Sequence, residues 1–139
     1  MTPREYRILD TREWLKRGTS DRVASAALIG EELPAEALFH AQQCAEKALK
    51  AFLTWHQTPF RKTHNLEELK QLCLPFVTTP SMYLENVNDL SKYAWRFRYP
   101  GAPYEPQREE AEEALRRASG LLDEIVSQLE LEFNRATPT

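Results

Sequence analysis

The sequence contains little that would cross-link a small fold or hold a metal ion. Its 139 residues include only two cysteines, Cys44 and Cys73, which lie 29 positions apart and show no Cys-x-x-Cys or Cys/His ligand spacing. This pattern excludes a disulfide framework and a zinc-type site as the basis of the fold. A chain of this length buries enough surface to fold without either. We expect both thiols to be reduced and mostly buried, and we expect no metal and no cofactor.

Long apolar runs and an excess of positive charge are also missing. No stretch approaches the roughly 18 consecutive apolar residues of a membrane-spanning helix. The formal net charge of -3 argues against a protein that binds nucleic acid through a broad cationic surface, although a local basic patch stays compatible with it. We therefore expect a cytoplasmic protein that has no membrane partner.

Glycine is scarce, and strong helix formers fill the chain instead. Only four glycines interrupt long stretches of Ala, Leu, Glu, Lys, Gln and Arg. Apolar residues make up 42% and charged residues 28%, which indicates a globular domain and not a disordered chain. The sequence predicts an all-α fold, an antiparallel up-and-down bundle of four to five helices. Residues 1–135 should form this single domain, followed by a loose tail at 136–139.

Prolines, glycines and capping residues divide the chain into predicted helices at about 11–29, 34–55, 63–73, 81–96 and 107–134. Gly18 to Asp21 is a possible interruption of the first helix, with Asp21 as the cap of a second segment. The inward residues expected in that helix are Trp14, Leu15, Val23, Ala27 and Leu28. Thr63 offers a cap for the third helix. The inner face of the fourth should consist of Leu84, Val87, Leu90 and Ala94.

The stretch from Phe39 to Lys50 is the most informative part of the chain, because polar residues border an apolar stripe on both sides. The stripe consists of Leu38, Ala41, Ala45, Leu49 and Phe52. At helical spacing, His40, Gln43 and Lys47 form one polar ridge, and Gln42, Glu46 and Lys50 form its neighbour. We expect these ridges to meet a partner.

Two interpretations of the ridges stay open. In the first, they form a dimer seam that binds nucleotide phosphate through Lys47 and Lys50, while His40 and the amides of residues such as Gln43 complete the hydrogen bonds. In the second, which we favour, they are structural or interfacial: Glu46 and Lys50 form an ordinary helix-surface pair, and the glutamines satisfy loop backbone groups. Ligand binding at the same seam is compatible with this second interpretation.

A loop before the third predicted helix gathers the cations Arg61, Lys62 and His64. A helix start offers backbone N–H groups and a dipole that favour an anion, so a phosphate site is one interpretation. The alternative is that Thr63 or Asn65 caps the helix while the cations are simply solvated.

Aromatic residues alternate with arginines near the end of the fourth predicted helix, where the candidate residues are Arg96, Arg98 and Tyr99. Because Pro100 disfavours helix at the preceding residue, we interpret this run as a fraying helix end whose rings close the bundle. Arg96 and Arg98 remain candidates for contact with RNA or a partner.

Three segments in this order resemble the HEPN family: Phe39 to Lys50, Lys62 to Leu66 at the head of a short helix, and Arg96 to Gly101 after the fourth helix. The resemblance spans nearly the whole chain. It implies a small helical domain that dimerises, that works beside a minimal nucleotidyltransferase encoded next to it, and that binds nucleotide or RNA. It also implies membership of toxin–antitoxin pairs for several branches.

In the nuclease branches of that family, an Arg followed after four to six residues by a His cleaves RNA across the dimer interface. None of His40, His56 and His64 is preceded by arginine at that spacing. Lys50 has the right distance from His56, but a lysine lacks the planar fork that holds a phosphate in two places. The ribonuclease motif is therefore absent, and an enzyme is not the favoured interpretation.

Three hypotheses follow. The first is a binding and assembly module: a homodimer that binds nucleotide or RNA and partners a small nucleotidyltransferase, in a toxin–antitoxin pair. The second is a metal-independent endoribonuclease in which His40 or His64 is the acid or base and Lys50, Arg61 or Arg96 stabilises phosphate charge. The third is a purely structural subunit.

Overall fold

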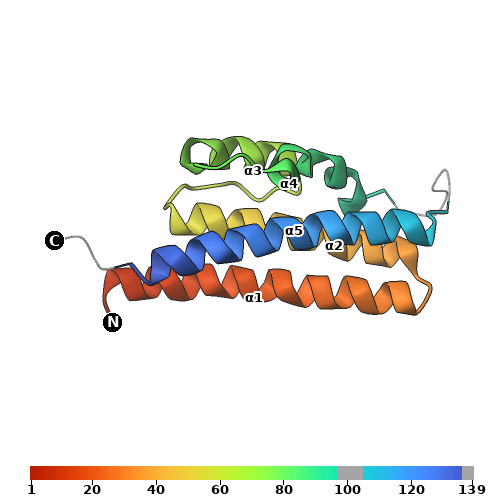
Figure 1. Ribbon diagram of the computed structural model, residues 1–139, viewed down its shortest axis with the longest axis horizontal. Helices are drawn as coiled ribbons and strands as arrows, with labels where there is room; N and C mark the ends of the chain where they lie inside the picture. The colour runs from red at the N-terminus through yellow and green to blue at the C-terminus, as the bar shows by residue number, and fades with distance from the viewer. Residues whose placement is uncertain (97–104, 136–139) are drawn as a thin grey trace.

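Three long helices build most of the protein. The computed structural model describes residues 1–96 and 105–135, in which α1 spans Pro3–Gly30, α2 spans Pro34–Trp55 and α5 spans Arg108–Phe133. The three helices lie side by side, with α1 antiparallel to the other two, and the start of α1 and the end of α5 lie at the same end of the bundle (Figure 1). The predicted all-α bundle is confirmed.

A second layer of short helices covers α2 and α5 on the side away from α1 (Figure 1). It consists of α3 (Leu66–Cys73), the 3-10 helix η1 (Leu74–Phe76), α4 (Met82–Glu85) and the 3-10 helix η2 (Val87–Ala94). The prediction of one continuous helix over 81–96 is wrong, because α4 ends just before Asn86, whose side-chain amide donates to the Met82 carbonyl oxygen at 3.0 Å. Asparagine competes with helical hydrogen bonds in this way. The predicted inner face of Leu84, Val87, Leu90 and Ala94 is nevertheless buried.

Helix α1 begins eight residues earlier than the predicted Thr11. Thr2 is its N-cap and accepts a hydrogen bond from the Glu5 backbone N–H at 3.1 Å, and Pro3 occupies the first helical position. Thr-x-x-Glu with proline at the first position is a helix-start signal that the sequence interpretation missed. The helix also runs through Gly18 and Asp21 without interruption, so Asp21 is not a cap.

The inner face of α1 is mostly small and polar, with Leu15 and Ile29 as its two buried apolar residues. Val23 is 64% exposed and Ala27 is also exposed, so their predicted inward positions are wrong, whereas Leu15 is buried and Trp14 and Leu28 are half-buried. Apolar periodicity locates a buried face only when that face is apolar. The residues of α1 that are buried are Thr11, Leu15, Gly18, Asp21, Ser25 and Ile29.

The core lies around α2, whose apolar stripe is buried as predicted. Opposite it, α5 contributes Ala111, Ala118, Leu122, Ile125, Leu129 and Phe133. A fully buried leucine stabilises the fold by about 1.5–3 kcal/mol relative to an exposed one. Both cysteines are buried, in agreement with the sequence prediction, and their side chains lie 3.9 and 4.0 Å from the carbonyl oxygens of Ala118 and Leu49.

Candidate binding site on the polar side of α2

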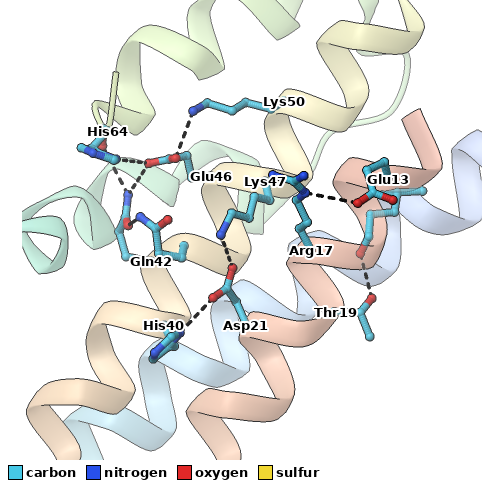
Figure 2. Close-up of polar contacts among 12 residues, drawn as sticks. Glu13, Arg17, Thr19, Asp21, His40, Gln42, Glu46, Lys47, Lys50 and His64 are labelled. Atoms are coloured by element: carbon cyan, nitrogen blue, oxygen red, sulfur yellow. Dashed lines mark hydrogen bonds and ion pairs between the residues drawn. The ribbon is translucent and has the colours of Figure 1, made fainter. Parts of the chain in front are cut away.

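Helix α2 buries polar side chains as well as apolar ones. Gln42, Gln43, Glu46 and Lys50 are each no more than 8% exposed. Buried polar groups cost free energy unless they are hydrogen-bonded, and a buried charge needs a partner of opposite sign. Two carboxylates supply these partners, and each is the centre of a small network (Figure 2).

The first network is the Asp21 centre, formed by Asp21, His40 and Lys47. His40 Nδ1 lies 2.8 Å from Asp21 Oδ1, and Lys47 Nζ lies 2.5 Å from Asp21 Oδ2. Asp21 belongs to α1, whereas His40 and Lys47 belong to α2, so this centre joins the two helices (Figure 2). The side chain of Asp21 is 11% exposed, and those of His40 and Lys47 are 32% and 21% exposed.

The second network is the Glu46 centre, formed by Gln42, Glu46, Lys50 and His64. Glu46 Oε1 accepts from Gln42 Nε2 at 3.1 Å and lies 2.7 Å from His64 Nδ1, while Lys50 Nζ donates to Glu46 Oε2 at 3.0 Å. The Glu46 side chain is only 3% exposed. The predicted surface pair of Glu46 and Lys50 is thus a buried pair, and this part of the structural interpretation is wrong.

The amides extend the Glu46 centre. Gln43 donates to Gln42 Oε1 at 2.6 Å, and Gln42 Nε2 also donates to the His64 backbone carbonyl at 3.3 Å. The Lys50 ammonium lies 5.6 and 5.8 Å from the ring centroids of Trp14 and Phe60, within the range of a cation–π contact. Gln42 satisfies a loop backbone group, as the structural interpretation predicted.

The geometry determines which imidazole nitrogen is available to a ligand. An ionised carboxylate can only accept a hydrogen bond, so Nδ1 of His40 and Nδ1 of His64 must carry the proton that each donates. Nε2 is therefore the nitrogen left for other contacts, on side chains that are 32% and 58% exposed. By contrast, Lys47 and Lys50 each have a carboxylate partner, so a phosphate would have to compete for them.

The loop cations lie beside this site. Arg61 Nε donates to Glu68 Oε1 at 2.6 Å, and this hydrogen bond lowers the pKa of Glu68 and raises that of Arg61. Lys62 is exposed. Asn65, not Thr63, is the N-cap of α3, because its side chain accepts from the Glu68 N–H at 3.1 Å.

The remaining predicted site residues lie elsewhere. Arg96 is half-buried after η2, and its backbone N–H donates to the Lys92 carbonyl oxygen at 2.9 Å. Arg98, Tyr99 and the predicted tail at 136–139 fall outside the described residues. The structure therefore brings His40, Gln43, Lys47, Lys50 and His64 together along α2.

Sequence reasoning missed Asp21 as a member of the site. Its spacing from Thr11, Gly18 and Ser25 was the available signal, because these residues share one side of α1 at steps of seven, three and four. Within residues 1–96 and 105–135, no three His, Cys, Asp or Glu side chains come together as a possible metal site. None of the helices in the same ranges is long and apolar enough to span a membrane.

The bundle of long helices with a layer of short ones, and a charged network along its second helix, defines a small all-helical module. The HEPN domain model matches residues 11–129. The chain therefore belongs to the HEPN family.

Two solved structures are similar over most of this chain. The protein TT1696 from Thermus thermophilus is 31% identical, with a TM-score of 0.75, and the match covers 84% of this chain and 96% of that one. ST0689, described as an archaeal HEPN homologue, is 26% identical with a TM-score of 0.68 and coverage of 85% and 96%. No curated protein matches the chain.

Proposed function

We propose that this HEPN protein is a binding and assembly module: a homodimer that binds nucleotide or RNA and partners a small nucleotidyltransferase in a toxin–antitoxin pair. The observation that supports this function best is the pair of imidazoles, half-buried in His40 and exposed in His64, that are each oriented by a buried carboxylate. These hydrogen bonds hold the side chains of His40 and His64 in fixed positions, and the exposed Lys62 precedes His64 by two residues. The missing Arg-x4-6-His motif favours binding over cleavage.

Nucleotide binding is tested by calorimetric titration of the full chain with ATP and with AMP. Binding should weaken at least about tenfold in His40→Ala and in His64→Ala, because each loses a hydrogen bond to a charged ligand. Lys16→Ala changes an exposed residue of α1 and should bind as the unchanged protein does. Equal affinities for all four proteins would remove the two histidines from the site.

Assembly is tested separately by sedimentation velocity, alone and with the product of any adjacent nucleotidyltransferase gene. A dimer that persists at micromolar concentration supports the module. A monomer that binds neither nucleotide nor RNA would contradict the module and leave only the hypothesis of a purely structural subunit.

An endoribonuclease is the second candidate, supported by the same hydrogen bonds. A histidine whose Nδ1–H is held by a carboxylate presents Nε2 for accepting and returning a proton, which is the arrangement of a general base. Incubation with structured and single-stranded RNA in the presence of chelator distinguishes the candidates. Cleavage that disappears in His40→Ala or His64→Ala supports the enzyme, whereas RNA binding without cleavage supports the module.

A further inference from the structure

A groove of about 630 Å³ lies between α2, α4 and α5, beside the segment that joins η1 to α4. It is lined from α2 by Leu49 and Phe52, from α4 by Leu84, and from α5 by Leu121 and Ile125. The volume falls within the range of about 300–1,000 Å³ that small-molecule sites occupy. The groove therefore has the size and the apolar floor for the body of a small organic molecule.

The mouth of the groove is polar and acidic. Thr78, Thr79 and Ser81 line one side, and Asp123, Glu124 and Gln128 of α5 line the other. No lysine, arginine or histidine is among the described residues that line it. Asp123 is paired with Arg22, so Glu124 is the carboxylate here that would repel an anionic ligand and attract a cationic one.

The charges along α5 single out Glu124. Between Arg117 and Arg135 the sequence contains four acidic residues and no lysine or arginine. Three of the four have an arginine partner: Asp123 pairs with Arg22 at 2.7 Å, Glu130 with Arg12 at 3.3 Å and Glu132 with Arg135 at 3.4 Å.

Glu124 differs from these three. Its Oε2 accepts a hydrogen bond from Ser81 Oγ at 2.5 Å, and no cation lies within ion-pairing distance of it among the residues described. Arg116 and Arg117 border a smaller neighbouring groove that Glu124 also lines, but both donate to Glu113. The carboxylate at the mouth of the larger groove is thus the acidic group of this stretch that lacks a positive partner.

We propose that this groove binds a small organic cation, an amine attached to an aliphatic or aromatic body, with its ammonium group against Glu124 and its body on the apolar floor. The assignment rests on the complementary charges of the ligand's ammonium group and Glu124 at the mouth of the groove. It is independent of the nucleotide or RNA function, because none of the groove residues belongs to the Asp21 or Glu46 centre.

The test uses three ligands that share one apolar body and differ in the end group: tryptamine, tryptophol and indole-3-propionate. Each is titrated into the full chain at pH 7 by calorimetry and by NMR. Tryptamine should bind at least about tenfold more tightly than tryptophol, as expected for a charge-assisted hydrogen bond. Indole-3-propionate should bind most weakly.

Three variants locate the binding. Glu124→Gln should reduce the preference for tryptamine over tryptophol to about one, because it removes the charge and keeps the shape. Thr79→Trp, at an exposed position of the rim, should block all three ligands. Glu109→Gln is the matched control, since Glu109 is exposed on α5 outside the groove, and it should change nothing.

Several outcomes would overturn the assignment. They are no binding of any of the three ligands at millimolar concentration, equal binding of tryptamine and tryptophol, or tryptamine binding that survives both Glu124→Gln and Thr79→Trp. If a second copy of the chain covers the groove instead, Thr79→Trp should lower the dimer fraction in sedimentation, which also rejects the small cation.

Discussion

The Asp21 and Glu46 centres use the same groups in different surroundings. Each carboxylate pairs with the Nδ1 of one histidine and the Nζ of one lysine. Asp21 takes both partners from another helix, whereas Glu46 takes Lys50 from the next turn of its own helix and His64 from a loop. The side chain of Glu46 is 3% exposed and that of Asp21 is 11% exposed.

Because the two carboxylates differ in exposure and in where their partners come from, we expect them to have different roles in stability. The Glu46 centre contains a lysine that is only 10% exposed, so loss of the carboxylate would leave that ammonium without water or a counter-charge. The lysine partner of Asp21, Lys47, is 21% exposed, so water can replace part of what the carboxylate provides to it. Glu46 should therefore matter more to the stability of the whole fold, and Asp21 more to the docking of α1.

The largest effect is expected for Glu46→Gln. We expect the free energy of unfolding to fall by about 3 kcal/mol, because the variant leaves Lys50 buried without a carboxylate. Urea denaturation followed by circular dichroism measures this change. Lys50→Met added to Glu46→Gln should recover part of the loss, since it removes the stranded charge.

The matched control is Arg61→Ala, which breaks a pair with Glu68 at the surface and should leave the urea midpoint unchanged. A loss below about 1 kcal/mol in Glu46→Gln would mean that Lys50 is hydrated in solution, and the contrast between the two centres would then fail.

A smaller effect is expected for Asp21→Asn. Its loss of stability should be about 1.5 kcal/mol, the lower end of the range for a hydrogen bond to a charged group, because its partners are partly hydrated. Native-state hydrogen exchange should show faster exchange in α1 than in α2 and α5, because this centre joins α1 to α2. Uniform acceleration across all three helices would contradict the proposed local role.

The smallest expected effect concerns the reactivity of the two thiols. Burial raises the pKa of both Cys44 and Cys73 to about 12. Since the thiolate is the reactive form, labelling by a disulfide reagent at pH 8 should be slow in the native protein and complete after denaturation. Because the pKa is raised, each thiol keeps its proton to a higher pH in the folded state than in the unfolded state. The contribution of the two thiols to the free energy of unfolding is therefore fully present below pH 9.0 and falls as the pH rises toward 12.

Thiol labelling also sharpens the comparison of the two centres. Cys44 lies beneath α1, where its carbonyl oxygen is 3.5 Å from the position of a Cβ built on Gly18, whereas Cys73 lies at the end of α3. Asp21→Asn should accelerate labelling of Cys44 more than that of Cys73, and peptide mass spectrometry distinguishes the two. Equal acceleration would indicate that the whole fold opens, not α1 alone.

Much of the fold followed from local patterns. The apolar stripe of α2 predicted its buried face, and Pro34 marked its start. Two helix boundaries were predicted wrongly because single polar side chains set them. Thr2 caps α1, which therefore begins earlier than predicted, and the Asn86 side chain marks the point where the fourth predicted helix divides. Apart from Leu15, the inner face of α1 escaped prediction because most of its residues are small or polar.

The candidate site was predicted in part. The ridge pattern identified His40, Gln43, Lys47 and Lys50 on one helix, because residues three and four apart share a face. The assignment of Lys47 and Lys50 to a free phosphate remains a prediction, and the carboxylates beside them make it less favourable. Asp21 and His64 reach this helix from segments 19 and 18 residues away, a proximity that no local pattern encodes.

The sequence by itself determined the all-helical class, the approximate positions of its helices, and the family resemblance, because helix propensity and apolar spacing act between neighbours along the chain. Only the tertiary structure decided how the charges pair. Whether a lysine at the border of an apolar stripe meets a phosphate, a second copy or a carboxylate of its own chain depends on which helix packs against it. In this protein α1 supplies Asp21 to Lys47, and α2 itself supplies Glu46 to Lys50.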